Sequence, residues 1–598
     1  MDAVGLDIEL TPAHFSVGCL NFRTNQSRQF EMFEGHPLDI STLNAILRER
    51  LIVTFNGTGF DIPLLMLAMK DGVTPQQLKR AADSIINGKL QPFQFYEKFD
   101  IQIPKWINHI DLIEVAPNVA SLKIYGGRIH CPKLQDMPVD HNAVLTPEQV
   151  QILLQYNIND LQITKSLYEE LKPQIELREQ MSKEYGVDLR SKSDAQMAET
   201  IITKEVSKKM GPVIRPTIDA GTTFKYLKPD FIDFKTHELQ SILTTVTQAS
   251  FTVPDSGQVV MPKEIANSKI TIGSSTYQLG IGGLHSTEQS VAHIADADYI
   301  LVDRDVVSYY PSIILNLGLA PAHMAEAFTH TYKSILARRL EAKKSGDKVT
   351  ANCLKIVVNG SFGKFGSKWS KLYSPNLMIQ TTLTGQLCLL MLIELLELEN
   401  IPVVSANTDG IVIKCPKDKV EMMAFVIWLW ETQTNFETEE THYSAIYSRD
   451  VNNYIAIKTD GGVKRKGAFA ISGLQKNPTN EICIEAVTEY LRSGTPIEQT
   501  IRASSDIRRF VTLRRVNNGA IKDGVSLGRA IRWYYASGID GAIHDKINNY
   551  TVPRTEGAKP ILDLPEQFPS DVNFDWYIEE ANSILQAIGA VQPEAVLA

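Results

Sequence analysis

Short apolar runs alternate with helical patterns over residues 1–170, which is typical of an α/β domain. The run that starts at Val4 and the run at residues 51–55 predict core strands. Further along, residues 401–406 and 411–415 predict two strands joined by a tight turn. The pattern therefore predicts a mixed chain with more than one sheet.

The stretch from Asp305 to Ser312 predicts a strand end, a tight bend and a helix start. It follows an apolar run at residues 299–302 and precedes another at residues 313–315. Pro311 fits the first helical turn, where a missing N–H costs nothing. This places a carboxylate at a strand end with an aromatic pair behind it. A buried structural turn is the alternative interpretation.

Several acids in the first 170 residues are placed to bind metal. Asp7 and Glu9 are two apart in a strand, so both project from the same face. Tyr156 and Asp160 share a helical face at i,i+4 spacing, and Asp61 follows the strand at residues 51–55. Such oxygen ligands suit Mg²⁺ or Mn²⁺, and two ions would activate a water against a phosphodiester. Taken singly, each acid is more typical of a surface or capping residue.

A basic helical hairpin follows the bend. Arg339 and Lys343 are four apart on one predicted helix, which ends near Ser345. Lys355, Asn359 and Phe362 share a face of a second helix. Together the helices would grip a triphosphate, while Phe362 and Gly363 would form a flat surface beneath a base pair. A solvated basic hairpin is the alternative.

Two turns complete the candidate chemistry. The Asp409-Gly410 pair between apolar runs predicts a β-hairpin, which would deliver the Asp409 carboxylate beside Asp305. A plain turn is the alternative. Glycines 280, 282 and 283 would let their N–H groups approach a phosphate closely.

Chain length, charge distribution and cysteine content limit the possible classes of protein. With 598 residues, two to four domains are expected. The net charge of −9 is uneven, because residues 333–371 carry +8 and residues 502–532 carry +6. A cationic track on an acidic body fits a nucleic-acid partner, with solvated helix faces as the alternative. The six scattered cysteines favour a reducing cytosol, and neither an 18-residue apolar stretch nor a charged leader is evident, so no membrane partner is expected.

The ordered acids resemble the three motifs of the proofreading 3′–5′ exonucleases attached to DNA polymerases. The segments are Asp7-Ile8-Glu9, Asn56 to Asp61, and Tyr156 to Asp160. The resemblance implies an active nuclease in which the four acids hold metal and Tyr156 orients the attacking water.

Three later segments resemble the motifs of family B DNA polymerases, in the same order. They are Asp305–Ser312, Lys355–Gly363 and Asn407–Gly410. With the nuclease motifs upstream, the chain is identified as a member of family B, of the compact kind found in bacteriophages. It departs from the family pattern at five positions: Tyr309, Gly360, Phe362, Asn407 and Gly410. The loss of an acid at Asn407 puts one metal contact in doubt.

The resemblance implies template-directed DNA synthesis with proofreading. Asp305 and Asp409 would hold two Mg²⁺ (or Mn²⁺) ions, as the nuclease acids would at their own site. Tyr310 would stack under the sugar and select dNTPs. Asn359 would pack near the nascent pair, beside a triphosphate bound by Arg339, Lys343 and Lys355. The residues expected to contact DNA are Gly282, Gly283, Phe362, Gly363, Tyr454 and Lys466.

The implied fold is α/β and α+β multidomain, with an RNase H-like exonuclease domain and a right-hand polymerase of palm, fingers and thumb. The expected boundaries are 1–175 for the exonuclease, 176–320 for the connecting region and first part of the palm, 321–363 for the fingers, 364–468 for the palm and 469–598 for the thumb. The thumb is expected to be mostly helical, with its Arg-rich run 502–532 tracking duplex phosphates beside Trp533, Tyr534 and Tyr535.

Motif spacing bears on priming and partners. Only 49 residues separate Asp305 from Lys355, and 53 separate Lys355 from Asp409. That leaves no room for the insertions of protein-primed relatives, so extension of an ordinary primer on template DNA is expected. A helicase and a single-stranded DNA-binding protein are expected partners of a monomer in a host bacterial cytoplasm. Residues 587–598 show no sliding-clamp peptide. The alternatives are a nuclease with a degenerate polymerase half and a non-catalytic DNA-binding scaffold.

Overall fold

The computed structural model describes residues 2–590, which form two compact units. Unit 1 comprises residues 2–193, 472–482 and 502–577, and unit 2 comprises residues 194–471, 483–501 and 578–590. Both contain helices and sheets, so the predicted mixed α/β class is confirmed. The five domain boundaries stay a prediction. Residues 587–598 were expected to contain no sliding-clamp peptide, and residues 591–598 of this segment lie outside the described residues.

Unit 1 begins with a five-stranded sheet of order β3-β2-β1-β4-β5. Its strands are β1 (Ala3–Leu10), β2 (Phe15–Asn21), β3 (Ser27–Met32), β4 (Leu51–Thr54) and β5 (His109–Asp111). The first three pair antiparallel, whereas β4 runs parallel to both β1 and β5. Apolar side chains at alternate β1 positions pack into a core with helices of one face, which leaves the acids on the other face.

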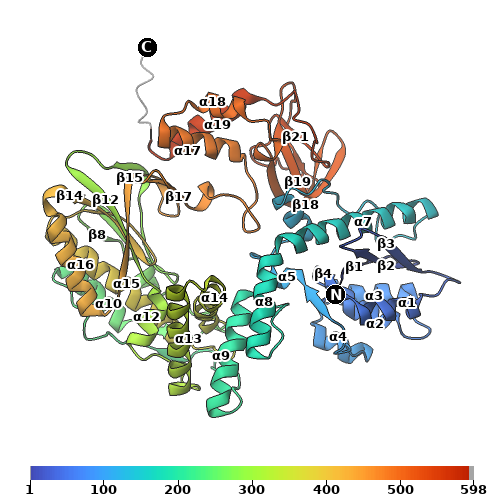
Figure 1. The fold of residues 1–598 in the computed structure, drawn as a ribbon, viewed down its shortest axis with the longest axis horizontal. Helices are drawn as coiled ribbons and strands as arrows, with labels where there is room; N and C mark the ends of the chain where they lie inside the picture. Colours follow the sequence, from blue (N-terminus) through green and yellow to red (C-terminus); the bar gives the residue numbers. More distant parts are fainter. Residues whose placement is uncertain (1, 591–598) are drawn as a thin grey trace. The chain divides into compact units, whose positions relative to one another are not determined.

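Helices cover both faces of this sheet (Figure 1). They are α1 (Ile40–Glu49), α2 (Asp61–Ala68), α3 (Pro75–Ile86), α4 (Pro92–Phe99), α5 (Leu112–Val115), α6 (Leu122–Arg128), α7 (Pro147–Glu170) and α8 (Lys172–Tyr185). α7 lies across β1 and β2 on the face that carries the acids. A capping box between Thr146 and Gln149, with Pro147 at the first turn, fixes where α7 begins.

The C-terminal part of unit 1 is a second, antiparallel sheet of order β20-β18-β19-β21. Its strands are β18 (Thr512–Lys522), β19 (Val525–Tyr535), β20 (His544–Asp545) and β21 (Ala558–Pro560). The prediction of a mostly helical region was wrong here. The β-branched residues Val516, Ile521, Val525 and Ile531 and the aromatic residues 533–535 favour strands, but the arginines between them obscured this preference.

Several residues expected to face DNA are instead buried in this sheet. Trp533, Tyr534 and Tyr535 are 1–3% exposed, so the expectation that they line a DNA track was wrong. Arg532 is also buried and donates to the carbonyls of Cys131, Pro132 and Leu562 at 2.8–3.1 Å. This guanidinium holds the sheet against the α6–α7 connection, which is a structural role.

Unit 2 is built on a ten-stranded sheet with the path β17-β16-β15-β12-β14-β13-β10-β9-β8, and β11 pairs with β15. The strands are β8 (Ile270–Ile272), β9 (Ser275–Leu279), β10 (Leu284–Ser286), β11 (Gln289–Ile294), β12 (Tyr299–Val306), β13 (Val403–Asn407), β14 (Gly410–Pro416), β15 (Thr438–Asp450), β16 (Asn453–Lys458) and β17 (Val463–Arg465). β6 (Thr223–Phe224) and β7 (Phe251–Thr252) form a separate pair.

The helices of unit 2 fall into two groups. Those that pack near the sheet are α10 (His237–Gln248), α11 (Lys263–Ala266), α12 (Tyr309–Asn316), α15 (Pro375–Leu398) and α16 (Val420–Thr434). A second group is α9 (Asp194–Met210), α13 (Ala325–Ser345) and α14 (Lys348–Phe365), which pack on one another (Figure 1). The remaining helices are α17 (Glu481–Ser493), α18 (Ile497–Ala503) and α19 (Phe574–Ala587).

α15 corrects one expectation from the sequence. By length and composition this helix is apolar enough to cross a membrane, although no such stretch was expected. However, 89% of its most apolar window is buried, in the core that α15 forms with α12, α16 and the sheet. Burial on all sides explains why α15 has little amphipathic character.

The two faces of β12 have different environments. Val302 and Val306 point into the core around α15, whereas Leu301 joins a small apolar cluster on the opposite face. Asp303 and Asp305 follow Leu301 at alternate positions, so they share that opposite face. The sheet thus separates its helical core from its carboxylates.

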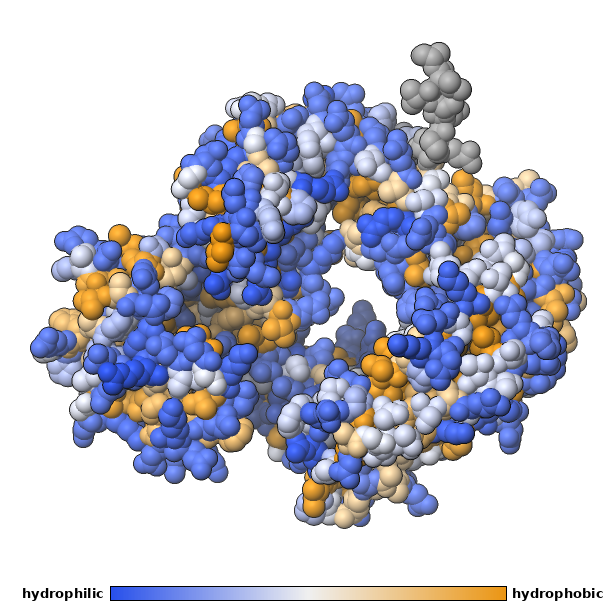
Figure 2. Space-filling model, turned by 180° about the vertical axis from the view of Figure 1, so that it is seen from behind, coloured by the Kyte–Doolittle hydropathy of each residue, from blue (hydrophilic) through white to orange (hydrophobic). Residues whose placement is uncertain are grey.

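At the surface, hydrophilic residues dominate the view of Figure 2 and hydrophobic residues form small groups. All six cysteines are free and buried.

Candidate functional site

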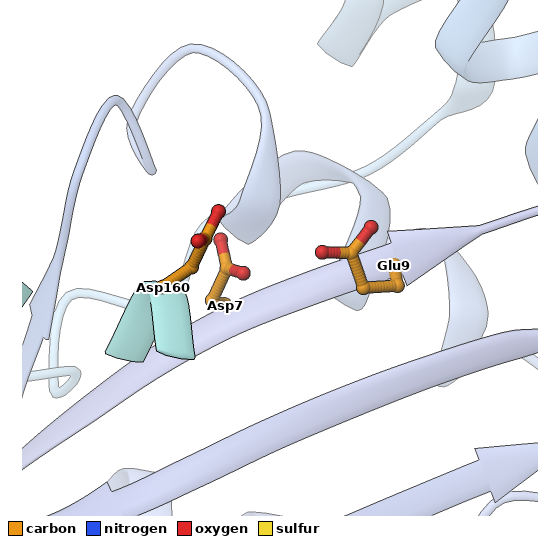
Figure 3. Close-up of side chains that lie close together, drawn as sticks. All are labelled: Asp7, Glu9 and Asp160. Atoms are coloured by element: carbon orange, nitrogen blue, oxygen red, sulfur yellow. The ribbon is translucent and has the colours of Figure 1, made fainter. Parts of the chain in front are cut away.

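The first candidate site is an acidic cluster on β1 and α7 of unit 1. Carboxylate oxygens of Asp7, Glu9 and Asp160 lie within 4.8 Å of one another. Figure 3 shows Asp160 directed at Asp7, with Glu9 further along the strand. Asn157, one helical turn before Asp160, donates its amide to Asp7 Oδ2 at 2.8 Å and fixes that carboxylate. The strand and helix spacings of the sequence thus bring three of the four predicted acids together.

Asp61 lies at the start of α2, outside that three-residue group. It is 4% exposed, and its Oδ1 accepts the N–H of Ile8 at 3.2 Å. Burial raises its pKa well above the usual range, and the nearby charge of Asp7 raises it further. The fourth predicted acid is therefore held against β1, between the two positions of the Asp-x-Glu pair.

Burial and mutual repulsion both act on the carboxylates of this cluster. Burial raises the pKa of Asp7 to about 7 and that of Glu9 well above its ordinary value, with Asp7 adding to the latter shift. Acids in this arrangement are stabilised in their charged form by a positive charge close by. The donor set consists of carboxylate oxygens, which are the ligands that Mg²⁺ and Mn²⁺ take.

Lys123 supplies such a charge, and the sequence analysis missed it. This α6 residue is 8% exposed, forms an ion pair with Asp160 Oδ1 and lies 4.4 Å above the ring centroid of Tyr156. Burial lowers its pKa to about 8, against the opposing effect of Asp7 and Glu9. No periodicity singles out Lys123, because its partners lie far away along the chain.

Asp111, at the end of β5, has a structural role. Its carboxylate accepts the N–H groups of Asn56 and Thr58 at 2.7 and 2.8 Å. Asn56 has a positive φ of 66°, so these bonds hold a strained turn just before Asp61.

The second candidate site is a cavity of about 780 Å³ in unit 2. It is lined by both polymerase-type acids and by the residues expected to bind the nucleotide: Asp305, Asp409, Tyr310, Arg339, Lys343, Lys355, Asn359 and Phe362. These residues come from β12, the β13–β14 turn, α12, α13 and α14. The fold therefore gathers into one cavity every nucleotide-site residue that the sequence singled out.

The carboxylates of Asp305 and Asp409 come from neighbouring antiparallel strands. Asp305 pairs with Gly410 across β12 and β14, and the N–H of Val306 donates to the carbonyl of Asp409 at 2.7 Å. A Cβ on Gly410 would collide with Asp305 Oδ1, which explains why glycine stands there. Burial raises the pKa of both acids, and the lysines nearby oppose that shift.

Basic side chains from the helical hairpin border the cavity. Arg339 Nη1 donates to Ser308 Oγ at 2.7 Å, which ties α13 to the bend after Asp305. Lys343 pairs with Glu439 at 3.2 Å, and its side chain is 65% exposed, so this contact is weak and exchangeable. The arrangement leaves cationic groups facing the cavity from α13 and α14.

An aromatic stack forms another wall. The rings of Tyr310 and Phe362 stack with centroids 4.3 Å apart, and the Tyr310 hydroxyl donates to the carbonyl of Gly282 at 2.7 Å. A Cβ on Gly282 or Gly363 would meet nothing within 4 Å, so both backbones are open to an approaching ligand. Gly283 instead lies against Thr408, where a Cβ would be 2.9 Å from a backbone atom.

Tyr309 and Gly360, two departures from the family pattern, have packing explanations. Tyr309 is 4% exposed, donates its hydroxyl to the carbonyl of Gly385 at 2.5 Å and packs edge-on against Phe436. A Cβ on Gly360 would lie 3.0 Å from the carbonyl oxygen of Asp194. Both residues therefore serve the core of unit 2.

Asn407, where the family has an acid, uses its amide as a donor. Nδ2 donates to the carbonyl of Val451 at 2.9 Å and lies 3.3 Å from Asn452 Oδ1. A carboxylate at this position would face a carbonyl oxygen without a proton to share. Asn407 therefore lacks the negative charge of the family's acid but forms a hydrogen bond to the β15–β16 turn.

Tyr454 and Lys466 lie near the same carboxylates. Lys466 Nζ is 6.0 Å from the Tyr454 ring centroid. Burial lowers the pKa of Lys466, and the charge of Asp409 opposes that shift. One further residue was missed: the buried Asp303, which forms an ion pair with Lys464 at 2.9 Å. Asp303 escaped notice because an acid inside an apolar run has no motif to mark it.

No protein-family model matches the chain, and no curated protein matches it in sequence. Among solved structures, the chain is similar to the family B DNA polymerase of the hyperthermophilic archaeon Pyrobaculum calidifontis. The two are 14% identical with a TM-score of 0.41, and the match covers 100% of this chain and 79% of the archaeal one.

Proposed function

We propose that this chain is a family B DNA polymerase that extends a primer on template DNA with dNTPs. The single observation that carries the proposal is one cavity where Asp305 and Asp409, the cationic side chains of α13 and α14, and an aromatic stack converge. A dNTP needs these groups: acids for cations, bases for the triphosphate, and a flat ring for the sugar.

Each residue that lines the cavity has its own role in this proposal. Arg339, Lys343 and Lys355 bind the triphosphate, while Tyr310 holds the sugar against its ring and excludes a 2′-hydroxyl. Asp305 and Asp409 would hold two Mg²⁺ (or Mn²⁺) ions, which activate the primer 3′-hydroxyl and stabilise the leaving pyrophosphate. Asn359 and Phe362, which also line the cavity, would pack against the nascent base pair.

We further propose that the acidic cluster of unit 1 is a 3′–5′ exonuclease site for proofreading. Asp7, Glu9 and Asp160 offer clustered carboxylates, and Asp61 lies against the same strand. Tyr156 lies beside them under Lys123, where its hydroxyl would orient an attacking water. The substrate would be the single-stranded 3′ end of a primer.

The proposal also covers the source of the protein, its oligomeric state and its partners. We propose a bacteriophage enzyme that works as a monomer in the host cytoplasm, with a helicase and a single-stranded DNA-binding protein as partners. The short motif spacing favours a nucleic-acid primer over a protein primer.

Two matched variants test both activities. Asp409→Asn should abolish primer extension and leave degradation of single-stranded 3′ ends intact, because the two sites use different acids. Asp7→Ala should do the reverse. Extension that is unchanged in Asp409→Asn would refute the polymerase assignment.

A nuclease with an inactive polymerase half is the second candidate, and the amide of Asn407 favours it. Extension of a mismatched primer by the wild-type protein separates the candidates. Removal of the mismatch followed by synthesis supports the polymerase, whereas removal without synthesis supports the nuclease.

A further inference from the structure

Strand β12 carries a buried carboxylate two residues before the cavity residue Asp305, and no motif includes it. Asp303 is 5% exposed, and its Oδ2 accepts a hydrogen bond from the hydroxyl of Tyr443 and another from Lys464 Nζ at 2.9 Å. A buried carboxylate needs such partners to stay ionised. Asp303 is thus a fixed anchor on the face of β12 that also carries Asp305.

Lys464 links this anchor to the cavity. Its Nζ lies 3.6 Å from Asp305 Oδ2, while its bond to Asp303 is shorter. The Lys464 side chain is 37% exposed and that of Asp303 only 6%, so the ammonium lies at the border between the buried acid and the open site. Lys464 can therefore release Asp305 without losing its own counter-ion.

Two ammonium groups lie close to the carboxylates of β12 and the β13–β14 turn. Those of Lys464 and Lys466 lie near Asp303, Asp305 and Asp409, in addition to Glu439 and the cationic side chains of α13 and α14 that line the cavity. Asn407 adds no charge. The affinity of an oxygen-ligand site for a divalent cation rises with the number of its charged ligands, and a nearby ammonium opposes binding.

We propose that Lys464, held by Asp303, is the counter-ion of Asp305 and Asp409 when no nucleotide is bound. Lys464 thereby makes divalent cation binding at these two carboxylates depend on the nucleotide. Without a nucleotide, the ammonium neutralises Asp305 and the site binds free cations weakly. The triphosphate brings additional oxygens and negative charge, and Asp303 then retains Lys464 while Asp305 turns to the cation. This inference rests on the proposed dNTP site, and it makes Asp303 and Lys464 positioning residues.

The test measures Mn²⁺ binding by electron paramagnetic resonance on the full chain. The background variant Asp7→Ala/Glu9→Ala removes cation binding at the exonuclease cluster. Lys464→Gln in that background removes the charge but can still donate to Asp303, so the buried acid keeps a partner. We expect Mn²⁺ affinity without nucleotide to rise about tenfold in Lys464→Gln.

Arg465→Gln is the matched control, since it removes one positive charge from the same strand at a residue that projects from the opposite face. We expect it to leave Mn²⁺ affinity unchanged. Addition of dNTP with a dideoxy-terminated primer–template should bring the background protein and Lys464→Gln to similar Mn²⁺ affinities.

Asp303→Asn gives an independent readout. With its anchor removed, Lys464 stays on Asp305, so Mn²⁺ binding should weaken even with nucleotide, and Lys464→Gln in the same chain should restore it. Tight Mn²⁺ binding by the background protein without nucleotide would overturn the inference, as would equal effects of Lys464→Gln and Arg465→Gln. Failure of the proposed function would show differently, as absent dNTP incorporation by the wild-type chain.

Discussion

The ring of Tyr310 stacks on the ring of Phe362, with 4.3 Å between their centroids, although one belongs to α12 and the other to α14. The Tyr310 hydroxyl is also fixed by the Gly282 carbonyl. Two contacts from distant segments thus hold the ring in one orientation. A ring fixed in this way presents a rigid surface to a bound sugar.

Replacing the ring should weaken sugar discrimination. In Tyr310→Ala, the space occupied by the ring opens, so the ratio of kcat/KM for dNTP over rNTP should fall by about tenfold or more. Tyr310→Phe keeps the ring and the stack and should retain most of the selectivity. Single-nucleotide incorporation with each substrate measures both variants. Equal selectivity in Tyr310→Ala and the wild type would contradict the proposed role.

Lys123 should stabilise unit 1 when divalent cations are absent. In Lys123→Met the buried acids lose their counter-charge, and the free energy of unfolding should fall by roughly 3 kcal/mol in chelator. Mn²⁺ should restore more stability to this variant than to the wild type. Thermal unfolding with and without Mn²⁺ provides the measurement.

Lys172→Met is the control for this experiment, because its ion pair with Glu176 is solvent-exposed on both sides. We expect a change below about 1 kcal/mol. A similar loss of stability in the two variants would argue against a special role for Lys123.

Asp7 should make the stability of unit 1 fall between about pH 4 and pH 7. Its folded-state pKa of about 7 exceeds the ordinary value of 3.8, so the fold favours the protonated form. The stability that this proton contributes is fully present below the unfolded pKa and is lost as the pH rises through about 7. Asp7→Asn, which cannot ionise, should reduce the fall in unfolding temperature over this interval, measured in chelator.

The exposed acid Asp71 offers a control in the same unit. Asp71→Asn should leave the pH dependence of the unfolding temperature as in the wild type. If Asp7→Asn also leaves it unchanged, the raised pKa of Asp7 is not the source.

Restoring the family acid at position 407 should not improve the enzyme. In Asn407→Asp a carboxylate faces the Val451 carbonyl, and the lost bond and repulsion should cost about 1–3 kcal/mol of stability. Primer extension should not increase, while exonuclease activity serves as the internal control. A large gain in extension would instead support the view that the polymerase half has degenerated.

The sequence predictions that agree with the structure depend on the spacing of residues close together in the chain. Asp7 and Glu9 lie on one strand face, Tyr156 lies one helical turn before Asp160, and the two-residue turn before Gly410 forms the expected hairpin. Strand and helix periods are properties of the backbone, so such relationships follow from residue numbers alone. The family resemblance added the order of these segments.

The residues that were missed depend on contacts between distant segments. Lys123 meets Asp160, and Asp303 meets Tyr443 and Lys464, through pairings that no local period encodes. The β18–β19 hairpin was missed for a related reason. Its arginines indicated a solvated surface. Arg532 is nevertheless buried, and its two Nη atoms donate hydrogen bonds to backbone carbonyls of the α6–α7 connection and of Leu562.

By itself, the sequence determined the mixed α/β class, the faces on which the acids lie, and the basic and aromatic groups of the candidate site in unit 2. Only the tertiary structure decided which charges are neutralised and by what. Periodicity sets the direction of a side chain from its own backbone, whereas the partner of a buried charge is set by whichever distant segment packs against it. In this protein those partners are lysines, placed beside the carboxylates at both candidate sites.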